Sequence, residues 1–468
     1  HEGNKLEYFY DANGNLKTVV ATDKDGISSV RTVNIYDAYG RKTEMDDQDK
    51  GKWFYSYNAF GELLSQTNAE KQITAFTYDS VGRQLRRHDQ SGTTCWDYGD
   101  SEISYNRGKL VRVRSFNNTV NCDTTASADY EELYGYNSRG LVANKLVRTA
   151  GSSFSSSTSY DAYNRLYTLT YPSWSLNPSD DIVVRHEYSS HNGMLTALKN
   201  HKNTAELYQE VIKVNARGQA TEVKYGNGAK ESRSFAADTG WVETLNLHNK
   251  AGALAHSFSY GYQLNGNLDW RDQRFGVNSN ASFNEDFTYD NLDRLKNRKI
   301  TNIGNSSAYT ALPAALKMEE NYYYDNWGNI TAKDGVGNYC YDATNPITRA
   351  KLTNRVTKVG SASNCSGTGS YVFTYDDNGN VESDGKRSFT YTAFEKPSRI
   401  TQGSNYTDFG YGPDRQLYRR TDLRDGKTTD TLYIDGLYER MIKSTGESEH
   451  KFYVGNAVIT KRSNSDVN

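Results

Sequence analysis

Hydrophobic and polar residues alternate along most of the chain with a period of two. In one clear example, Trp53, Tyr55 and Tyr57 fall on one face of an extended segment, and Phe54 and Ser56 fall on the other. Polar, turn-forming stretches separate such segments, among them 23–26, 46–51, 67–71 and 89–92. This alternation predicts short strands joined by tight turns, which together form a long antiparallel meander.

A second class of turn is marked by a repeated motif, Tyr-Asp-x-x-Gly. Its first copies begin at Tyr10, Tyr36, Tyr57 and Tyr78. The Asp or Asn that follows the tyrosine can accept a hydrogen bond from a backbone N–H two residues further on. Gly, Asn and Asp at the fifth position tolerate a positive φ. The motif therefore predicts a hairpin whose turn is closed by a left-handed residue.

The motif predicts the positions of the repeat turns along the whole chain. Its nine copies place the repeat-turn residues at Tyr10, Asp11, Gly14, Tyr36, Asp37, Gly40, Tyr57, Asn58, Gly61, Tyr78, Asp79, Gly82, Tyr136, Asn137, Gly140, Tyr160, Asp161, Asn164, Tyr289, Asp290, Asp293, Tyr324, Asp325, Gly328, Tyr375, Asp376 and Gly379. Degenerate copies begin near Tyr105, Val214, Tyr262, Tyr391 and Tyr411. We expect the left-handed conformation at Gly14, Gly40, Gly82, Gly328, Asn164 and Asp293.

Two stretches interrupt the repeat. The serine-rich stretch Ser152–Ser159 is predicted to be a loop, and residues 311–318, within the stretch 302–320, are predicted to form a helical turn. We interpret both as insertions, near 150–160 and 302–320, because nothing in the composition marks a domain boundary. The sequence therefore predicts one continuous repeat unit over residues 1–468. Because a sheet of so many strands cannot lie flat, we expect it to twist, coil or close.

Composition supports an all-β protein and excludes several classes of function. Among 468 residues there are 37 Tyr and only 6 Pro, so the low hydrophobic content of 36% does not indicate disorder. The formal net charge is −2, which lacks the basic excess typical of a protein that binds nucleic acid. No apolar run reaches the roughly 18 residues of a membrane-spanning helix, so no membrane insertion is expected.

The tyrosines have two interpretations. They could stack on one another across neighbouring strands, with each pair contributing roughly 0.2–1 kcal/mol. They could also form an aromatic surface that binds glycans, because a tyrosine offers an apolar face and a polar tip.

The four cysteines form two local pairs, and neither pair has the spacing of a zinc ribbon or a thioredoxin motif. We predict the disulfides Cys95–Cys122 and Cys340–Cys365, which would suit an oxidising compartment. The alternative is that these residues are free, half-buried thiols.

No constellation of catalytic or metal-binding residues stands out. The adjacent acids Asp46-Asp47, Asp180-Asp181 and Glu319-Glu320 lie in polar stretches, where such pairs usually face solvent. The spacing of His186, His191 and His201 matches no metal site of known geometry, and one acid in each repeat turn is too few to hold calcium. No nucleophile elbow, P-loop or dinucleotide-binding motif occurs. We therefore expect a protein that is not an enzyme and that needs no cofactor or metal.

The repeated Tyr-Asp-x-x-Gly-Arg pattern resembles the YD repeat of RHS-repeat proteins. These include bacterial polymorphic toxins, the B and C components of Tc toxins and the shells of teneurins. The segments 432–440 and 452–455 are similar to the late part of bacterial RHS shells. The resemblance implies a ribbon of β-hairpins that winds as a spiral around a hollow interior. It also implies an aspartate-dependent self-cleavage site with Asp-Pro motifs after the repeats, but this sequence has no Asp-Pro dipeptide, so self-cleavage is not expected.

The resemblance also implies a function. The chain would be a non-catalytic structural shell that encloses or presents a C-terminal toxin absent from this chain. Its partners would be that toxin domain, a secretion-system or receptor protein, and glycans. The protein would be secreted and monomeric. The alternative is an adhesion or carbohydrate-binding module of the teneurin type at the cell surface.

Overall fold

The computed structural model describes residues 5–22, 26, 28–117, 119–122, 127–175, 177–276, 281–304, 319–341, 354–360 and 370–463. These residues form an almost entirely antiparallel β structure, as predicted from the alternating pattern. Within the described part of the chain, the single helical element is the 3-10 helix η1 (Pro178–Asp180).

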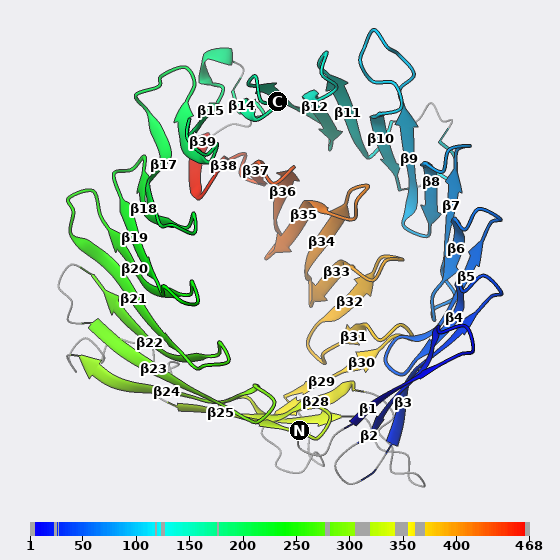
Figure 1. The fold of residues 1–468 in the computed structure, drawn as a ribbon. Coiled ribbons are helices and arrows are strands. Elements are labelled where there is room, and N and C mark those ends of the chain that lie inside the picture. The colour runs from blue at the N-terminus through cyan, green and yellow to red at the C-terminus, as the bar shows by residue number, and fades with distance from the viewer. Residues whose placement is uncertain are drawn as a thin grey trace.

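Most strands belong to one sheet of 29 strands, and the remainder form a sheet of 10 strands (Figure 1). The first sheet contains β1 (Lys5–Tyr10), β2 (Leu16–Thr22), β3 (Ser28–Tyr36), β4 (Lys42–Asp47), β5 (Gly51–Tyr57), β6 (Leu63–Thr67), β7 (Ile73–Tyr78), β8 (Gln84–Asp89), β9 (Gly92–Tyr98), β10 (Leu110–Phe116), β11 (Tyr130–Tyr136), β12 (Val142–Thr149), β13 (Ser152–Tyr160), β14 (Leu166–Thr170), β15 (Val183–Tyr188), β16 (Leu195–Asn200), β17 (Leu207–Val214), β18 (Ala220–Tyr225), β19 (Lys230–Phe235), β20 (Val242–His248), β21 (Leu254–Tyr262), β22 (Leu268–Phe275), β23 (Ala281–Tyr289), β24 (Leu295–Gly304), β25 (Glu319–Tyr324), β26 (Ile330–Lys333), β27 (Gly337–Tyr341), β28 (Val356–Gly360) and β29 (Tyr371–Val372). The second contains β30 (Thr374–Tyr375), β31 (Val381–Ser383), β32 (Ser388–Tyr391), β33 (Pro397–Gln402), β34 (Asn405–Tyr411), β35 (Leu417–Arg424), β36 (Lys427–Ile434), β37 (Tyr438–Lys443), β38 (Ser448–Val454) and β39 (Ala457–Ser463).

Each YD turn ends its first strand with a β-bulge at the motif tyrosine. The register shifts between Thr77 and Tyr78, for example, and the same shift occurs at Tyr36 and Tyr289. The residue in the fifth position then has a positive φ, as predicted. The values are +84° at Gly14, +76° at Gly40, +82° at Gly82, +90° at Gly328, +63° at Asn164 and +59° at Asp293. A bulge increases the local twist of a strand pair, so a bulge in most hairpins curves the whole ribbon.

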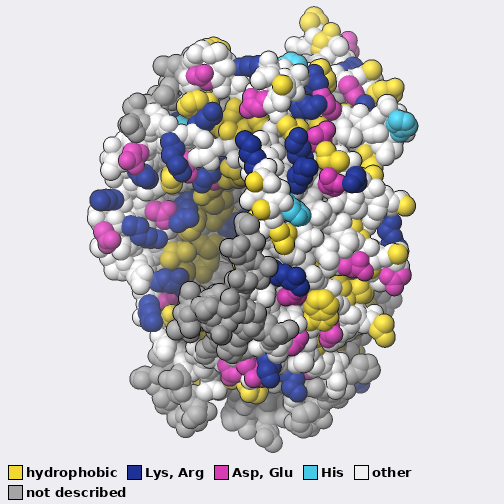
Figure 2. Space-filling model, turned by 90° about the vertical axis from the view of Figure 1, so that its left-hand side faces the viewer, with side chains coloured by type: hydrophobic (Ala, Val, Ile, Leu, Met, Phe, Trp, Pro, Cys, Tyr) yellow, Lys and Arg dark blue, Asp and Glu magenta, His cyan; other side chains and the backbone are white. Residues whose placement is uncertain are grey.

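The curved ribbon winds past its own beginning. The first sheet follows the circumference of a ring, and the second sheet crosses the interior of that ring in Figure 1. The chain runs from one sheet into the other at Phe373, whose N–H donates to the carbonyl of Thr357. One face of the molecule has a hollow, and hydrophobic side chains are visible inside it (Figure 2).

Contacts between the two windings show that the spiral tightens. Near its start, paired residues are 309 positions apart, as in Ala69 and Asn378. The separation falls to 282 for Tyr171 and Tyr453, and to 247 for Gln209 and Asn456. The second winding therefore passes inside the first, as the resemblance to a spiral shell implied.

The hydrophobic core lies where the end of the second winding meets the inner face of β11–β17. Aromatic rings meet across this contact, at centroid distances of 4.7 Å for Tyr130 and Tyr418 and 5.7 Å for Phe154 and Tyr438. Phe452, with 0% of its surface exposed, lies at the centre. Apolar packing against β11–β17 therefore holds the C-terminal strands in place.

The predicted loop at Ser152–Ser159 is wrong, because these residues form most of β13 and pair with both β12 and β14. Phe154 of this strand is buried in the core cluster. Its packing and the two hydrogen-bonded ladders outweigh the weak strand preference of serine. In the second predicted insertion, β24 extends to Gly304 and β25 begins at Glu319. The predicted helical turn at 311–318 lies outside the described residues.

Candidate functional site

The repeat turn is the most regular arrangement of polar side chains in the molecule. In the copy at Tyr78, the Oδ1 atom of Asp79 accepts hydrogen bonds from the N–H groups of Val81 and Arg83, at 3.0 and 2.9 Å. Its Oδ2 atom accepts from the Nε of Arg83 at 2.6 Å. The carboxylate therefore holds both the backbone of the turn and the side chain that follows the glycine.

The arginine that follows the glycine joins one hairpin to the next. The Cζ atom of Arg83 lies 4.3 Å from the ring centroid of Tyr98, and its guanidinium also donates to the carbonyl of Gly108 at 3.2 Å. The same cation–π geometry recurs, with distances of 4.3–5.5 Å, for Arg41 over Tyr57, Lys109 over Tyr136, Arg165 over Tyr188, Arg294 over Tyr324, Arg355 over Tyr375 and Lys396 over Tyr411.

The motif tyrosine makes a second link between hairpins. Its hydroxyl donates to the carbonyl of the residue that opens the return strand of the preceding hairpin, at 2.6–3.2 Å. The pairs are Tyr36–Leu16, Tyr57–Lys42, Tyr78–Leu63, Tyr98–Gln84, Tyr136–Leu110, Tyr160–Val142, Tyr188–Leu166, Tyr262–Val242, Tyr289–Leu268, Tyr324–Leu295, Tyr341–Ile330, Tyr375–Val356, Tyr391–Val381 and Tyr411–Pro397. We call this hydroxyl bond, with the cation over the ring where one is present, a repeat junction.

The repeat junction corrects the predicted ladder of stacked tyrosines. Among the described residues, no ring contact joins the motif tyrosines of neighbouring repeats. In seven of the fourteen junctions, the ring instead meets a cation from the preceding turn, and the ring of Tyr262 meets Trp241. Burial raises the pKa of several of these phenols, among them Tyr36 and Tyr57, and raises that of Tyr341 to about 12, which keeps the hydroxyl protonated and able to donate.

The residue after the glycine is matched to the residue after the tyrosine. Where an aspartate follows the tyrosine, the residue after the glycine is a hydrogen-bond donor, as in Asp37–Arg41 and Asp11–Asn15. An asparagine, whose amide nitrogen donates, is followed by an acceptor, as in Asn58–Glu62 and Asn215–Gln219. In these four turns the two positions form a hydrogen-bonded pair of side chains with opposite polarity, which the turn at Tyr136 lacks because Leu141 follows its glycine.

The turn aspartates are held in their ionised form. Burial would raise the pKa of Asp37, but hydrogen bonds from the backbone N–H and side chain of Arg41 outweigh it, and the pKa is lowered. The same balance lowers the pKa of Asp79, Asp161 and Asp290. At Asp11, the amide of Asn15 is the main cause of the lowered pKa. These shifts come from turn capping and not from an acid placed for catalysis.

The structure also contains repeat junctions that the motif search missed. Tyr98, Tyr188 and Tyr341 each make the hydroxyl bond, although Gly, Ser and Asp follow them and their turns have other lengths. The degenerate copy predicted near Tyr105 is wrong in position. Tyr105 lies inside the turn that follows Tyr98, with a φ of +54°. The spacing of tyrosines at strand ends was the signal for these junctions.

Polar contacts join the two windings along a row that we call the seam. In its first part, the carboxylate of Asp49 accepts hydrogen bonds from the backbone and side-chain N–H groups of Asn354, at 2.7 and 2.9 Å. In its second part, the Oδ1 atom of the buried Asn378 accepts from the N–H of Ala69 at 2.9 Å. The third joins the N–H of Ala393 to Ser91. Turns of the second winding therefore sit on the inter-motif turns of the first.

The disulfide Cys95–Cys122 is present, as predicted, with a Cα–Cα distance of 5.8 Å. It fixes the segment after β10, and Arg86 and Arg114 add hydrogen bonds to the carbonyls of Val120 and Cys122. Cys340 is also disulfide-bonded. Since Cys365 lies outside the described residues, the pairing Cys340–Cys365 stays a prediction.

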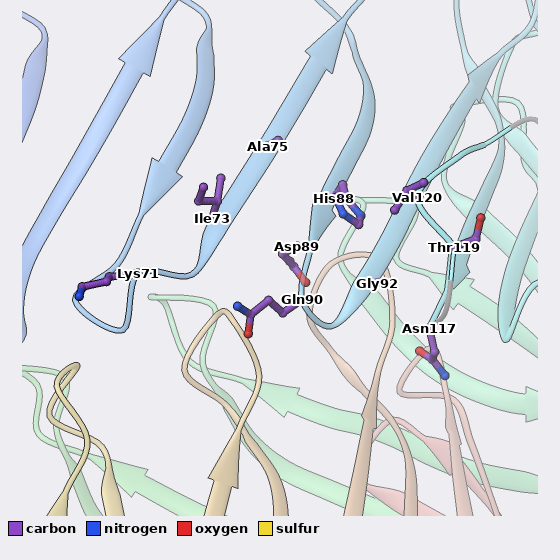
Figure 3. A pocket seen from close by; sticks show the side chains of 10 residues that line it. All are labelled: Lys71, Ile73, Ala75, His88, Asp89, Gln90, Gly92, Asn117, Thr119 and Val120. Carbon is purple, nitrogen blue, oxygen red and sulfur yellow. The ribbon is translucent and has the colours of Figure 1, made fainter.

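The segment after β10, which the disulfide holds in place, forms one wall of a pocket of about 410 Å³ (Figure 3). Ile73 and Ala75 of β7 and His88 of β8 form the opposite side, and Asp89 and Gln90 extend from the end of β8. Among its described lining residues there is no Phe, Tyr or Trp, so the pocket lacks the flat platform expected of the glycan-binding interpretation.

Acids inside the winding are paired with bases. The buried Glu285 accepts from the Nε atoms of Arg271 and Arg298, each at 2.7 Å. Burial raises the pKa of Glu285, but these bonds outweigh it and lower the pKa. Glu132 and Asp435 share Lys145, at 2.9 and 2.6 Å, which ties β12 to the end of the second winding. These two networks stabilise the sheet.

The remaining candidates from the sequence do not converge. Asp46 and Asp47 lie in β4, Asp180 ends η1, and Glu319 opens β25. Across the described ranges, no group of three His, Cys, Asp or Glu side chains could hold a metal ion. Among those same residues, no helix is long and apolar enough to cross a membrane.

Comparison with known proteins agrees with the motif. The RHS Repeat family model matches residues 57–94. A tRNA3(Ser)-specific nuclease, WapA, from Bacillus spizizenii is 28% identical over 160 residues, which cover 30% of this chain and 7% of the nuclease.

Solved Tc toxin structures share the fold over nearly the whole chain. The crystal structure of TcdB2-TccC3 without its hypervariable C-terminal region matches 99% of this chain with a TM-score of 0.75 and 15% identity. The Photorhabdus luminescens Tc holotoxin pore matches 98% with a TM-score of 0.63 and 14% identity. The chain spans about a quarter of the length of these solved chains. The resemblance stated from the YD motif is confirmed: the chain carries an RHS repeat and has the spiral β-shell fold of the Tc toxin chain TcdB2-TccC3.

Proposed function

We propose that this chain is a non-catalytic structural shell that encloses a toxin segment belonging to the same polypeptide and following the repeats. The observation that carries the proposal is the inward spiral, in which β36–β39 pack across the ring against β11–β17. The fold shared with a Tc toxin and the match to a tRNA-specific nuclease support it. Residues 1–468 act in it as one continuous unit.

The proposal assigns the polar residues to structure. The turn aspartates cap turns, and the interior acids are paired with Arg or Lys, so catalysis by the shell is not required. The disulfide Cys95–Cys122 suits a protein that works after secretion, and a secretion-system or receptor protein would complete its delivery.

Protease protection tests the proposal. An unstructured reporter peptide with one protease site is attached after Asn468, and the same peptide is attached before His1 as the control. Enclosure predicts slower cleavage of the C-terminal reporter than of the N-terminal one. It also predicts that Phe452→Ala, which loosens the closing strands, removes the difference. Equal cleavage of both reporters in the unaltered chain would contradict enclosure.

A second candidate function is adhesion through glycans. The tips of several YD turns carry exposed aromatic side chains, with 85% of Tyr39 and 90% of Phe60 exposed. An aromatic row on a surface is a feature of carbohydrate-binding modules. Binding to a glycan array that is lost in a Tyr39→Ala, Phe60→Ala variant would favour adhesion, and absence of binding would leave the shell as the single proposal.

A further inference from the structure

The strand β1 has a free edge. It pairs with β2, and no described residue pairs with its other side. Four of its six side chains are apolar and at least half exposed, namely Leu6 (58%), Tyr8 (53%), Phe9 (50%) and Tyr10 (61%). A regular edge strand with apolar side chains on both faces is a template for another strand.

Tyr10 is half of a repeat junction. The other complete copies of the motif bond the tyrosine hydroxyl to the hairpin before them, as Tyr36 bonds to Leu16 and Tyr57 to Lys42. Among the described residues, none accepts a bond from the hydroxyl of Tyr10 and no cation lies over its ring. A strand placed beside β1 could supply the carbonyl, and a cation as in half of the other junctions.

The seam also continues beyond β1. The YD turn that contains Trp327 meets the first winding at Arg31, whose Cζ lies 4.7 Å from the indole centroid. A pocket of about 340 Å³ lies between this turn, Leu292 of the preceding YD turn, and Lys5 and Leu6 of β1. Three later turns of the second winding, at Asn354, Asn378 and Ala393, rest on inter-motif turns of the first. The pocket is where the next such contact would form.

We propose that the free edge of β1 binds the return strand of a YD hairpin. That strand places a backbone carbonyl at the hydroxyl of Tyr10 and an arginine or lysine over its ring. Its adjoining inter-motif turn fills the pocket beside Leu292.

A second copy of this chain fits the edge poorly. A second copy offers two terminal strands: its own β1, which opens a hairpin and is not a return strand, and β39, which follows the turn at Gly455 and Asn456. That turn belongs to no YD motif and places no arginine or lysine after a left-handed fifth residue. Self-association is therefore an outcome that the experiment must detect.

Fluorescence anisotropy with a labelled peptide tests the proposal on the full chain. The peptide copies Ile73–Asp89, a complete YD hairpin whose Arg83 and Gln84 carbonyl make the junction with Tyr98. We expect saturable binding. Tyr10→Phe should weaken it about two- to tenfold by removing one hydrogen bond. Replacing Arg83 of the peptide by Gln should weaken it about two- to fivefold.

The controls distinguish binding through the repeat junction from nonspecific binding. With Tyr10→Ala, the Arg and Gln peptides should bind equally, because the ring that distinguishes them is gone. Tyr39→Ala removes a still more exposed tyrosine from a turn tip and should leave binding unchanged. Binding that ignores Tyr10→Ala would overturn the proposal. The proposal would also be overturned by a concentration-dependent dimer that requires Tyr10 and that the peptide does not dissociate.

A fused hairpin covers the case in which the free peptide does not fold. The same hairpin is joined before His1, in its Arg83 form and in an Arg83→Gln form. The Arg form should raise the melting temperature above both the Gln form and the unfused chain. Equal melting temperatures for all three, together with no peptide binding, would rule the edge site out.

Discussion

The guanidinium of Arg83 lies over the ring of Tyr98, 4.3 Å from Cζ to centroid, while its Nε donates to Asp79 in its own turn. One side chain therefore contacts two successive hairpins. The hydroxyl of Tyr98 returns the link by donating to the carbonyl of Gln84, the residue next to Arg83. This reciprocal contact explains why tyrosine and arginine occupy fixed places in the motif, because each is the partner of the neighbouring copy.

A double-mutant cycle on Arg83→Gln and Tyr98→Leu should show this coupling. We expect an interaction free energy of about 0.5–1 kcal/mol, the usual range for an exposed cation–π pair. Hydrogen exchange of β8 and β9 amides in the native state measures it locally, which suits a repeat protein. Arg462→Gln, which removes an exposed arginine paired with Glu449, should show no coupling to Tyr98.

Replacing a turn aspartate by asparagine should depend on its partner. Asp79→Asn places an amide donor against Arg83, which has no acceptor, so the turn should be destabilised. Asp11→Asn should be tolerated, because the amide of Asn15 can turn its oxygen toward the new donor. Thermal unfolding of the two variants tests this contrast, and equal losses would contradict it.

Stability should fall in acid through the turn aspartates. Their folded-state pKa lies below the ordinary value of 3.8, so the ionised form contributes stability above that pH. The contribution is lost as the pH falls from about 4 through the lowered pKa. In urea unfolding at a series of pH values, a combined Asp79→Asn and Asp161→Asn variant should lose less stability than the unaltered chain between pH 5 and pH 2.

A side chain at Gly82 should be costly for two reasons. Gly82→Val forces a β-branched residue to a φ of +82°, at about 1–2 kcal/mol, and its Cβ would lie 3.0 Å from the Oε1 atom of Glu62. Gly61→Val has the same backbone penalty but open space around Cβ. Gly82→Val should therefore be at least as destabilising as Gly61→Val, and Gly82→Asn should be milder than either, as measured by melting temperature.

Removing the disulfide should loosen one pocket wall. The bond closes a segment of 27 residues, so the change Cys95→Ala with Cys122→Ala should cost about 2–4 kcal/mol. We expect the increased hydrogen exchange to be concentrated in β9, β10 and residues 119–122. Loss of protection spread evenly over both windings would show that the bond acts globally.

Phe452→Ala should release the end of the second winding. Phe452 is fully buried and contacts Tyr171 and Tyr438, so its truncation should cost about 3–5 kcal/mol. Limited proteolysis should then cut first within β36–β39. Tyr453→Ala, on the opposite face of the same strand and 36% exposed, should leave those strands protected.

The sequence was sufficient to predict what depends on neighbouring residues. Gly82 and Asn164 share a motif position, and the left-handed backbone of both follows from turn chemistry alone. The meander follows from alternation in segments such as 53–57. The disulfide Cys95–Cys122 was predicted because the two cysteines lie about one repeat apart, although Cys122 lies in the segment after β10 and not on a strand.

Other features depend on residues far apart in the chain. Ser152–Ser159 is a poor strand by composition, but Phe154 packs on Tyr438, almost 300 residues later, and this contact cannot be read locally. Stacking was predicted for the tyrosines because strand pairing alone does not show that a basic side chain from the previous turn covers many of the rings. The seam pairs Asp49 with Asn354 through turns that carry no motif of their own.

The seam fixes the order in which the molecule can assemble. A hairpin such as β7–β8 closes over a few residues and forms within microseconds. The seam must bring together Asp49 and Asn354, 305 positions apart, and the entropic cost of such a closure is borne chiefly by the first contact. Once it forms, Ala69 and Asn378 need only short further segments to meet. We expect the ribbon to form early and the two windings to join in a single slow step. The remaining contacts should then form one after another along the seam.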